Sequence, residues 1–208
     1  MPINERNGII IMDEHKNTPD SKVNEAQPAY DVHYTYADYL TWDDDIRREL
    51  IDGVPYLMAA PNYRHQELSG NLYMQLRAFL KGKLCKVLYA PLDVRLNATT
   101  LDDTVVQPDL VIICDHSIID NAGIKGAPDM VAEILSPSTS RKDRTLKFDR
   151  YQKAGVREYW IIDPETRSLA VNILKDGKYI THAYTKEETV PVHVLEGFSV
   201  NLPRVFAE

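Results

Sequence analysis

Length, composition and charge place the chain among ordinary globular proteins. The sequence has 208 residues, of which 44% are hydrophobic and 26% are charged, so disorder and fibrous repeats are excluded as its main character. Its 24 Lys and Arg residues against 31 Asp and Glu residues give a net charge of −7, which excludes a protein that coats nucleic acid non-specifically. Any contact with DNA or RNA must therefore be local.

The cysteines and the lengths of the apolar runs indicate where in the cell the protein is located. The sequence holds two cysteines, Cys85 and Cys114, without the close spacing of a metal site or the number typical of a disulfide scaffold. We therefore expect both to be buried, reduced thiols. No run approaches the roughly 18 apolar residues of a membrane span, and the N-terminus has no apolar signal region. These features predict a cytoplasmic protein with no membrane partner.

The chain is predicted to consist of a flexible N-terminal tail over residues 1–29 and a single folded domain over residues 30–208. Residues 13–29 are polar and contain proline without apolar periodicity, which is typical of a tail. A short apolar run at 8–11 is compatible with a strand.

Helical and extended patterns alternate along the predicted domain. Leucines at three- and four-residue spacing predict a long amphipathic helix over 62–83, and a second helical pattern over 140–154 ends at Gly155. Asp-Gly pairs at 52–53 and 176–177 predict type I′ hairpin turns. The predicted short helix, hairpins and other strands lie at 36–40, 48–59, 86–90, 92–96, 105–114, 130–135, 157–162 and 168–184. This mixture predicts an α/β fold.

Common nucleotide and hydrolase motifs are missing. The chain lacks a Walker lysine loop, a Gly-x-Gly-x-x-Gly turn after a strand, a Gly-x-Ser-x-Gly elbow and a His-Glu-x-x-His helix. These absences disfavour nucleotide-cofactor, serine hydrolase and zinc protease chemistry. Chemistry carried out by acidic side chains remains as the candidate.

Two acidic residues stand within apolar strands and need partners. Asp109 lies in an apolar run, and Glu133 shares one face of the next predicted strand with Val131 and Leu135. A buried acid without a partner is costly. Two converging carboxylates commonly bind a hard divalent cation such as Mg²⁺. The plain alternative is that a backbone amide or an arginine satisfies each acid.

The following helix places a cation near these acids. Asp143, Lys147 and Tyr151 fall at i, i+4 and i+8 and so line one side of it. The connection from the strand of Glu133 is short enough for Lys147 to reach back toward the two acids. The ordinary alternatives are that Lys147 extends into solvent, that Tyr151 packs in the core and that Asp143 complements the helix dipole.

These residues and their flanking motifs resemble the Uma2 family of restriction-endonuclease-like proteins. The resemblance rests on Pro108-Asp109, Glu133 to Ser138, Asp143, Lys147, Tyr151, Ala154 to Val156 and Glu158 to Asp163, and upstream on Glu49 to Gly53, Pro61 and His65. It covers residues 35–205, with several separated motifs in the expected order.

The resemblance implies a PD-(D/E)XK nuclease fold, which is a central mixed β-sheet flanked by helices, here with additional β-hairpins. It implies that Asp109 and Glu133, helped by the Ile134 carbonyl, bind Mg²⁺ or Mn²⁺. Leu135 stands where the namesake lysine is expected, and Lys147 resembles a lysine that has migrated to the neighbouring helix. In that arrangement Lys147 stabilises the developing negative charge or orients the attacking water.

Four further residues complete the predicted site. Glu49 is a candidate additional acid near the metal, and a protective charge on an edge strand is the alternative. His65, at the start of the long helix, is a candidate phosphate contact, or else a surface or capping residue. Asp143 is a candidate support for Lys147, and the Tyr151 hydroxyl is a candidate donor to one of the acids.

The leading functional hypothesis is a Mg²⁺-dependent endonuclease that hydrolyses DNA phosphodiester bonds, acting as a homodimer because two-fold symmetry matches a duplex. One alternative is a catalytically weak or inactive module that binds nucleic acid or protein, which Leu135 and the net charge of −7 favour. Another is a metal-free structural domain in which Glu133 and Lys147 form a buried ion pair.

Overall fold

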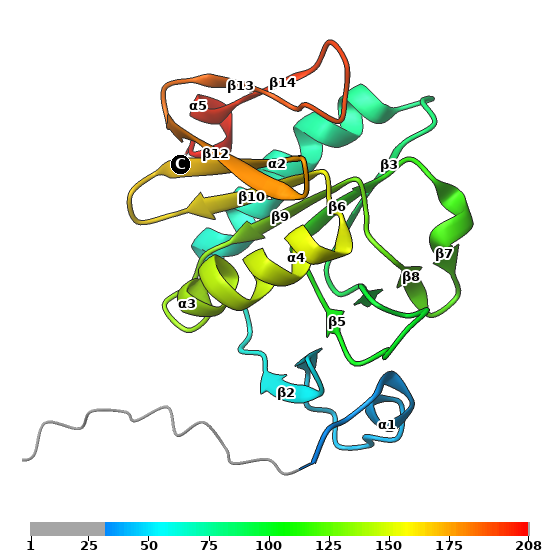
Figure 1. Ribbon diagram of the computed structural model, residues 1–208. Helices are drawn as coiled ribbons and strands as arrows, with labels where there is room; N and C mark the ends of the chain where they lie inside the picture. The colour runs from blue at the N-terminus through cyan, green and yellow to red at the C-terminus, as the bar shows by residue number, and fades with distance from the viewer. Residues whose placement is uncertain (1–31, 208) are drawn as a thin grey trace, which may run out of the picture.

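The computed structural model describes residues 32–207 as two six-stranded β-sheets and one two-stranded sheet, accompanied by helices (Figure 1). The strands are β1 (Arg48–Ile51), β2 (Val54–Leu57), β3 (Lys86–Tyr89), β4 (Val94–Arg95), β5 (Val105–Val106), β6 (Leu110–Ile113), β7 (Ile119–Asp120), β8 (Gly123–Lys125), β9 (Met130–Ile134), β10 (Glu158–Asp163), β11 (Ser168–Lys175), β12 (Lys178–Thr185), β13 (Thr189–Pro191) and β14 (Ser199–Asn201). The helical segments are α1 (Tyr36–Tyr39), α2 (Tyr63–Leu80), η1 (His116–Ile118), α3 (Ser140–Lys142), η2 (Asp143–Lys147), α4 (Phe148–Ala154) and α5 (Leu202–Val205). The predicted tail over 1–29 and the apolar run at 8–11 lie outside the described residues.

The central sheet has the strand order β12-β11-β10-β9-β6-β3 and carries helices on both faces (Figure 1). β9 and β10 are parallel, and the other neighbouring strands of this sheet are antiparallel. The leucines of α2 pack on one face against Ala132 and Trp160. On the other face, Tyr151 of α4 packs with Val131 and Tyr159. The expected mixed sheet flanked by helices is confirmed.

The second sheet has the order β2-β1-β5-β4-β8-β7 and consists of short strands. Its β1–β2 hairpin has the predicted turn, because Asp52 and Gly53 both have positive φ values, 54° and 73°. The β11–β12 hairpin of the central sheet turns in the same way through Asp176 and Gly177. The strands β7, β8, β13 and β14 have no counterpart among the predicted strands.

Helix α2 confirms the long amphipathic helix predicted over 62–83. It begins after Asn62, whose side chain accepts a hydrogen bond from the His65 backbone amide at 2.9 Å. Its buried face is formed by leucines at four-residue spacing. Among the described helices, none combines the length and apolar character that crossing a membrane requires.

The helix predicted over 140–154 is confirmed in extent, but its winding changes along its length. It begins as α3, continues through the π-helical turn η2 and returns to α-helix in α4. It ends at Gly155, whose φ of 90° lies in the left-handed region. Segments of π-helix are rare and occur frequently at functional sites. This one contains Asp143 and Lys147, both of them buried.

The apolar run over 105–114 is divided into two strands and is not the single strand that its composition predicts. Gln107, Pro108 and Asp109 separate β5 from β6, and the two strands belong to different sheets. Pro108 has no amide proton to donate to a strand ladder, which favours a break at this point. Asp109 therefore precedes β6 and does not lie inside a strand.

The expectation of two reduced thiols is wrong, because Cys85 and Cys114 form a disulfide bond. Strand β3 pairs with β6 so that Lys86 faces Ile113, and the residues just outside this pair therefore lie opposite each other. The strand register thus joins two half-buried cysteines that are 29 positions apart. Disulfides are rare in reducing compartments, and the cytoplasmic location stays a prediction.

Candidate active site

A cleft of about 460 Å³ lies where β1, the start of α2, the break before β6, the end of β9 and the α3–η2 segment meet. Its lining includes every predicted site residue except Tyr151: Glu49, His65, Asp109, Glu133, Ile134, Asp143 and Lys147. Tyr151 lies behind the lining, fully buried, and donates its hydroxyl to Glu133 Oε1 at 2.7 Å. The fold therefore brings together all the residues that the sequence singles out.

Glu133 is the buried acid at the end of β9. Its Oε1 atom accepts hydrogen bonds from Lys147 Nζ at 2.8 Å and from the Tyr151 hydroxyl at 2.7 Å. Burial raises the pKa of Glu133, the Lys147 ammonium lowers it, and the carboxylates of Asp143 and Asp109 raise it again, so that the pKa is about 8. The cleft therefore favours the neutral form of Glu133 more than water does, and a further cation entering the cleft would favour the charged form.

Lys147 lies among three carboxylates and does not extend into solvent. Its ammonium is 2.6 Å from Glu49 Oε1, 2.8 Å from Glu133 Oε1 and 3.6 Å from Asp143 Oδ1. Burial alone would lower the pKa of Lys147, but these carboxylates outweigh burial and raise the pKa well above its usual range. Lys147 is therefore a permanent cation of the cleft.

Glu49 is fully buried on β1, and both of its carboxylate oxygens have partners. Oε1 accepts a hydrogen bond from the Gln107 backbone amide at 3.0 Å and faces Lys147, while Oε2 lies 2.6 Å from Lys142 Nζ. Burial raises the pKa of Glu49, but the ammonium groups of Lys147 and Lys142 outweigh burial and lower the pKa to about 2. The alternative of an edge-strand charge is wrong, because β1 lies between β2 and β5.

Asp109 connects the break before β6 to the end of β9. Its Oδ2 atom accepts a hydrogen bond from the Ile134 backbone amide at 2.7 Å and lies 3.1 Å from His65 Nε2. Burial lowers the pKa of His65, but its hydrogen bond to Asp109 and the charge of that carboxylate raise it, and the net change is upward. The His65 Nδ1 atom is buried without a hydrogen-bond partner among the described residues.

Three residues that line the cleft, Arg47, Gln107 and Lys142, are not among the site residues predicted from the sequence. Lys142 contacts Glu49, and the Gln107 side-chain carbonyl accepts a hydrogen bond from Arg47 Nη2 at 2.7 Å. Lys142 lies in a basic stretch over 141–144, for which the sequence offers two interpretations, a contact with a nucleic-acid backbone or the more ordinary solvated helix face. Gln107 belongs to the unexpected break between β5 and β6. None of the three positions carries a local signal that distinguishes it from an exposed polar residue.

The oxygen atoms of the cleft fit a hard divalent cation held by few protein ligands. Within residues 32–207, no hydrogen-bond donor reaches Asp109 Oδ1 or Glu133 Oε2. No group of three or more His, Cys, Asp or Glu side chains in that range is arranged to enclose a metal. Mg²⁺ commonly binds through one or two carboxylates, waters and substrate phosphates. In the described part of the chain, Asp109 and Glu133 each keep one carboxylate oxygen free beside Ile134, and this arrangement matches the way in which proteins commonly bind Mg²⁺.

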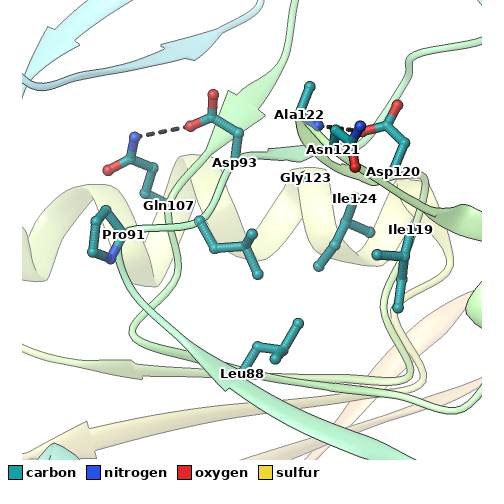
Figure 2. Close-up of a pocket in the computed structure, with 11 residues that line it drawn as sticks. Leu88, Pro91, Asp93, Gln107, Ile119, Asp120, Asn121, Ala122, Gly123 and Ile124 are labelled. Carbon is teal, nitrogen blue, oxygen red and sulfur yellow. Dashed lines mark hydrogen bonds between the residues drawn. The ribbon is translucent and has the colours of Figure 1, made fainter.

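A second cavity, of about 390 Å³, lies beside the cleft and shares Pro91 and Gln107 with it. Figure 2 shows the Gln107 side chain directed toward Asp93, and Gln107 Nε2 donates to Asp93 Oδ1 at 2.8 Å. Leu88 and Ile124 contribute apolar surface (Figure 2). Its described lining includes no Lys, Arg or His. The combination of carboxylates and lysines therefore belongs to the first cleft.

Comparisons with known proteins identify the family. An uncharacterized protein from Synechocystis is 29% identical over 116 residues, which are 55% of this chain and 60% of that relative, so less than two thirds of the relative is covered. A crystal structure of a "putative nuclease belonging to DUF820" from Anabaena variabilis gives a TM-score of 0.68 at 21% identity, covering 83% of this chain and 97% of that chain. This likeness shows the restriction-endonuclease-like fold. The model of the Uma2 family, "Putative restriction endonuclease", matches residues 36–203, and the chain therefore belongs to the Uma2 family.

Proposed function

We propose that this protein is an endonuclease that hydrolyses DNA phosphodiester bonds with Mg²⁺, or with Mn²⁺ in its place. The convergence of Asp109, Glu133 and Lys147 on one cleft carries the proposal, because metal-assisted phosphodiester hydrolysis uses carboxylate ligands and a nearby cation. The family description, which names restriction endonucleases, supports the same class of reaction.

In this proposal Asp109 and Glu133 hold the metal through their free oxygens, with the Ile134 carbonyl as a further ligand. The bound metal supplies Lewis acidity toward a phosphate oxygen and makes a bound water more acidic. The Ile134 amide and His65 fix one oxygen of Asp109, and Lys147 and Tyr151 fix one oxygen of Glu133. Each ligand is therefore held on one side and open on the other.

Lys147 stabilises the negative charge that develops during phosphodiester hydrolysis. Its ammonium orients the attacking water and opposes the negative charge that builds on the phosphate. Glu49 and Asp143 keep that ammonium beside Glu133. His65 holds Asp109 through its Nε2 atom, and its place in the lining of the cleft supports the proposed contact with a phosphate.

A metal-free structural domain is the second candidate, because Lys147 and Glu133 form the buried contact that this alternative requires. In that case Lys147 variants lose stability and there is no activity to lose. A catalytically weak or inactive binding module is the third candidate, and it predicts DNA binding in Mg²⁺ without cleavage.

Incubation of the full chain with supercoiled plasmid and single-stranded DNA tests the proposal. Cleavage is expected in Mg²⁺ or Mn²⁺ and is expected to stop when EDTA removes the metal. Cleavage that persists in EDTA would contradict the metal-dependent mechanism. Sedimentation with and without a DNA duplex tests the homodimer that we propose for cleavage of both strands; a monomer bound to the duplex would contradict it.

A further inference from the structure

Lys142 is a second lysine of the cleft that the proposed reaction does not use. Its Nζ atom lies 2.6 Å from Glu49 Oε2 and 5.4 Å from the centre of the Tyr56 ring. Its side chain is 12% exposed, compared with 4% for Lys147. Both lysines line the same cleft, and Lys142 is the more accessible to an entering ligand.

The π-helical turn explains why both lysines face one carboxylate. Lys142 and Lys147 are five positions apart, and in a regular α-helix residues five apart point about 140° away from each other. Hydrogen bonds in a π-helical turn run between residues five apart, so such residues stand nearly above one another. The turn η2 follows directly after Lys142 and includes Lys147. It thereby directs both ammonium groups to Glu49.

The two lysines differ in the number of N–H donors that remain for a ligand. Lys147 lies 2.6 Å from Glu49 and 2.8 Å from Glu133, while Asp143 is 3.6 Å away, beyond hydrogen-bond distance. At most one of its three N–H donors therefore remains for a ligand. Lys142 has one carboxylate partner among the described residues, Glu49. Two of its donors therefore remain for the cleft, and a lysine ammonium is a compact charge suited to phosphate oxygens.

We propose that Lys142 binds a phosphate of the nucleic-acid backbone in the cleft, an assignment that rests on the proposed function. In this arrangement Glu49 is a positioning residue, because both of its oxygens are occupied by the two lysines and the Gln107 amide. Lys147, the more buried lysine, keeps its proposed role toward the attacking water, and Lys142, the more exposed lysine, contacts the backbone phosphate. The π-helical turn is the element that makes this division of roles possible.

The salt dependence of DNA binding tests the assignment without relying on cleavage. Binding of a fluorescein-labelled DNA duplex is measured by anisotropy between about 50 and 200 mM salt, with Ca²⁺ in place of Mg²⁺ and with intact DNA checked on a gel. Each lysine–phosphate contact contributes about 0.9 to the slope of log affinity against log salt. Lys142→Met is expected to reduce the slope by about 0.9, and Lys142→Arg is expected to keep it.

Lys153→Met is the matched control. Lys153 lies on α4, its side chain is 63% exposed, and it pairs with Asp149 at 2.9 Å outside the cleft. The substitution removes the same charge and is expected to leave the slope unchanged. If Lys142→Met fails to fold, comparison of Glu49→Gln with Glu49→Gln/Lys142→Met measures the same difference without leaving a buried carboxylate unpaired.

The outcomes separate this assignment from the proposed function. An unchanged slope in Lys142→Met, with normal binding by the wild type, overturns the assignment and leaves the proposed function standing. Equal losses in Lys142→Met and Lys153→Met also overturn it, because they indicate a general charge effect. A wild-type protein that binds neither duplex nor single-stranded DNA overturns the proposed function together with the assignment.

Discussion

Charge balance among individual side chains gives two neighbouring acids opposite pKa shifts. Lys147 lies 2.6 Å from Glu49 and 2.8 Å from Glu133, yet the pKa of Glu49 is about 2 and that of Glu133 is about 8. Both acids are buried, which raises both values. Glu49 has Lys142 as a second cation, whereas Glu133 has the like charge of Asp143 nearby. Of these two acids, Glu133, the proposed metal ligand, is therefore the one whose pKa is raised.

Metal binding is predicted to release a proton from Glu133 at neutral pH. Because burial and the adjacent carboxylates raise its pKa to about 8, the neutral acid dominates at pH 7, and a metal must displace its proton. Titration calorimetry with Mn²⁺ in buffers of different ionisation enthalpy measures this release. We expect about one proton for the wild type at pH 7 and close to none above pH 9 or in Glu133→Gln. A wild-type heat that does not depend on the buffer would contradict the raised pKa.

Lys147→Met is predicted to lower the free energy of unfolding by about 3–5 kcal/mol, because it leaves buried carboxylates without their shared cation. Urea denaturation measures the loss. Lys153→Met makes the same chemical change at a side chain that is 63% exposed, and it is expected to change stability by less than about 0.5 kcal/mol. Similar losses in the two variants would argue against a buried charge cluster.

At the scale of whole elements, the sequence predicts those helices and turns that residues close together in the chain determine. Leucine periodicity locates α2, and the two Asp-Gly pairs locate their hairpin turns. The π-helical turn and the disulfide of Cys85 depend on packing and strand register, which no local pattern encodes. The sequence therefore identifies Glu133 and Lys147 as site residues, but it places Lys142 only in a basic stretch and does not connect it with Glu49.

Two glycine-to-alanine substitutions, one in the β1–β2 hairpin and one in helix α2, are predicted to change the free energy of unfolding in opposite directions. Gly53 has a φ of 73°, and a Cβ atom there would lie 2.3 Å from the His33 ring, so Gly53→Ala is expected to cost about 1–2 kcal/mol. Gly70 lies within α2 and has open space at its Cβ position, so Gly70→Ala is expected to add about 1 kcal/mol. Thermal or urea denaturation measures both. A neutral Gly53→Ala would contradict the turn geometry.

At the scale of the whole molecule, the cleft exists because separate parts of the fold meet there. The central sheet contributes Glu133, the second sheet contributes Glu49, and α2 contributes His65. The net charge of −7 leaves attraction for nucleic acid to local cations, of which Arg47, Lys142 and Lys147 line the cleft. The sequence motifs suggest which residues belong together, but strand order across two sheets is needed to bring Glu49 to Lys147.

Cleavage of supercoiled plasmid by a set of folded variants tests the proposed nuclease site most directly. The set is wild type, Asp109→Asn, Glu133→Gln, Lys147→Met and the control Lys153→Met, each assayed with Mg²⁺ below its own unfolding temperature. We expect cleavage by the wild type and by Lys153→Met, and a loss of about a hundredfold or more in the other three variants. Cleavage by Glu133→Gln at the wild-type rate, or none by the folded wild type on plasmid or single-stranded DNA, would contradict the assignment of this cleft as a nuclease site.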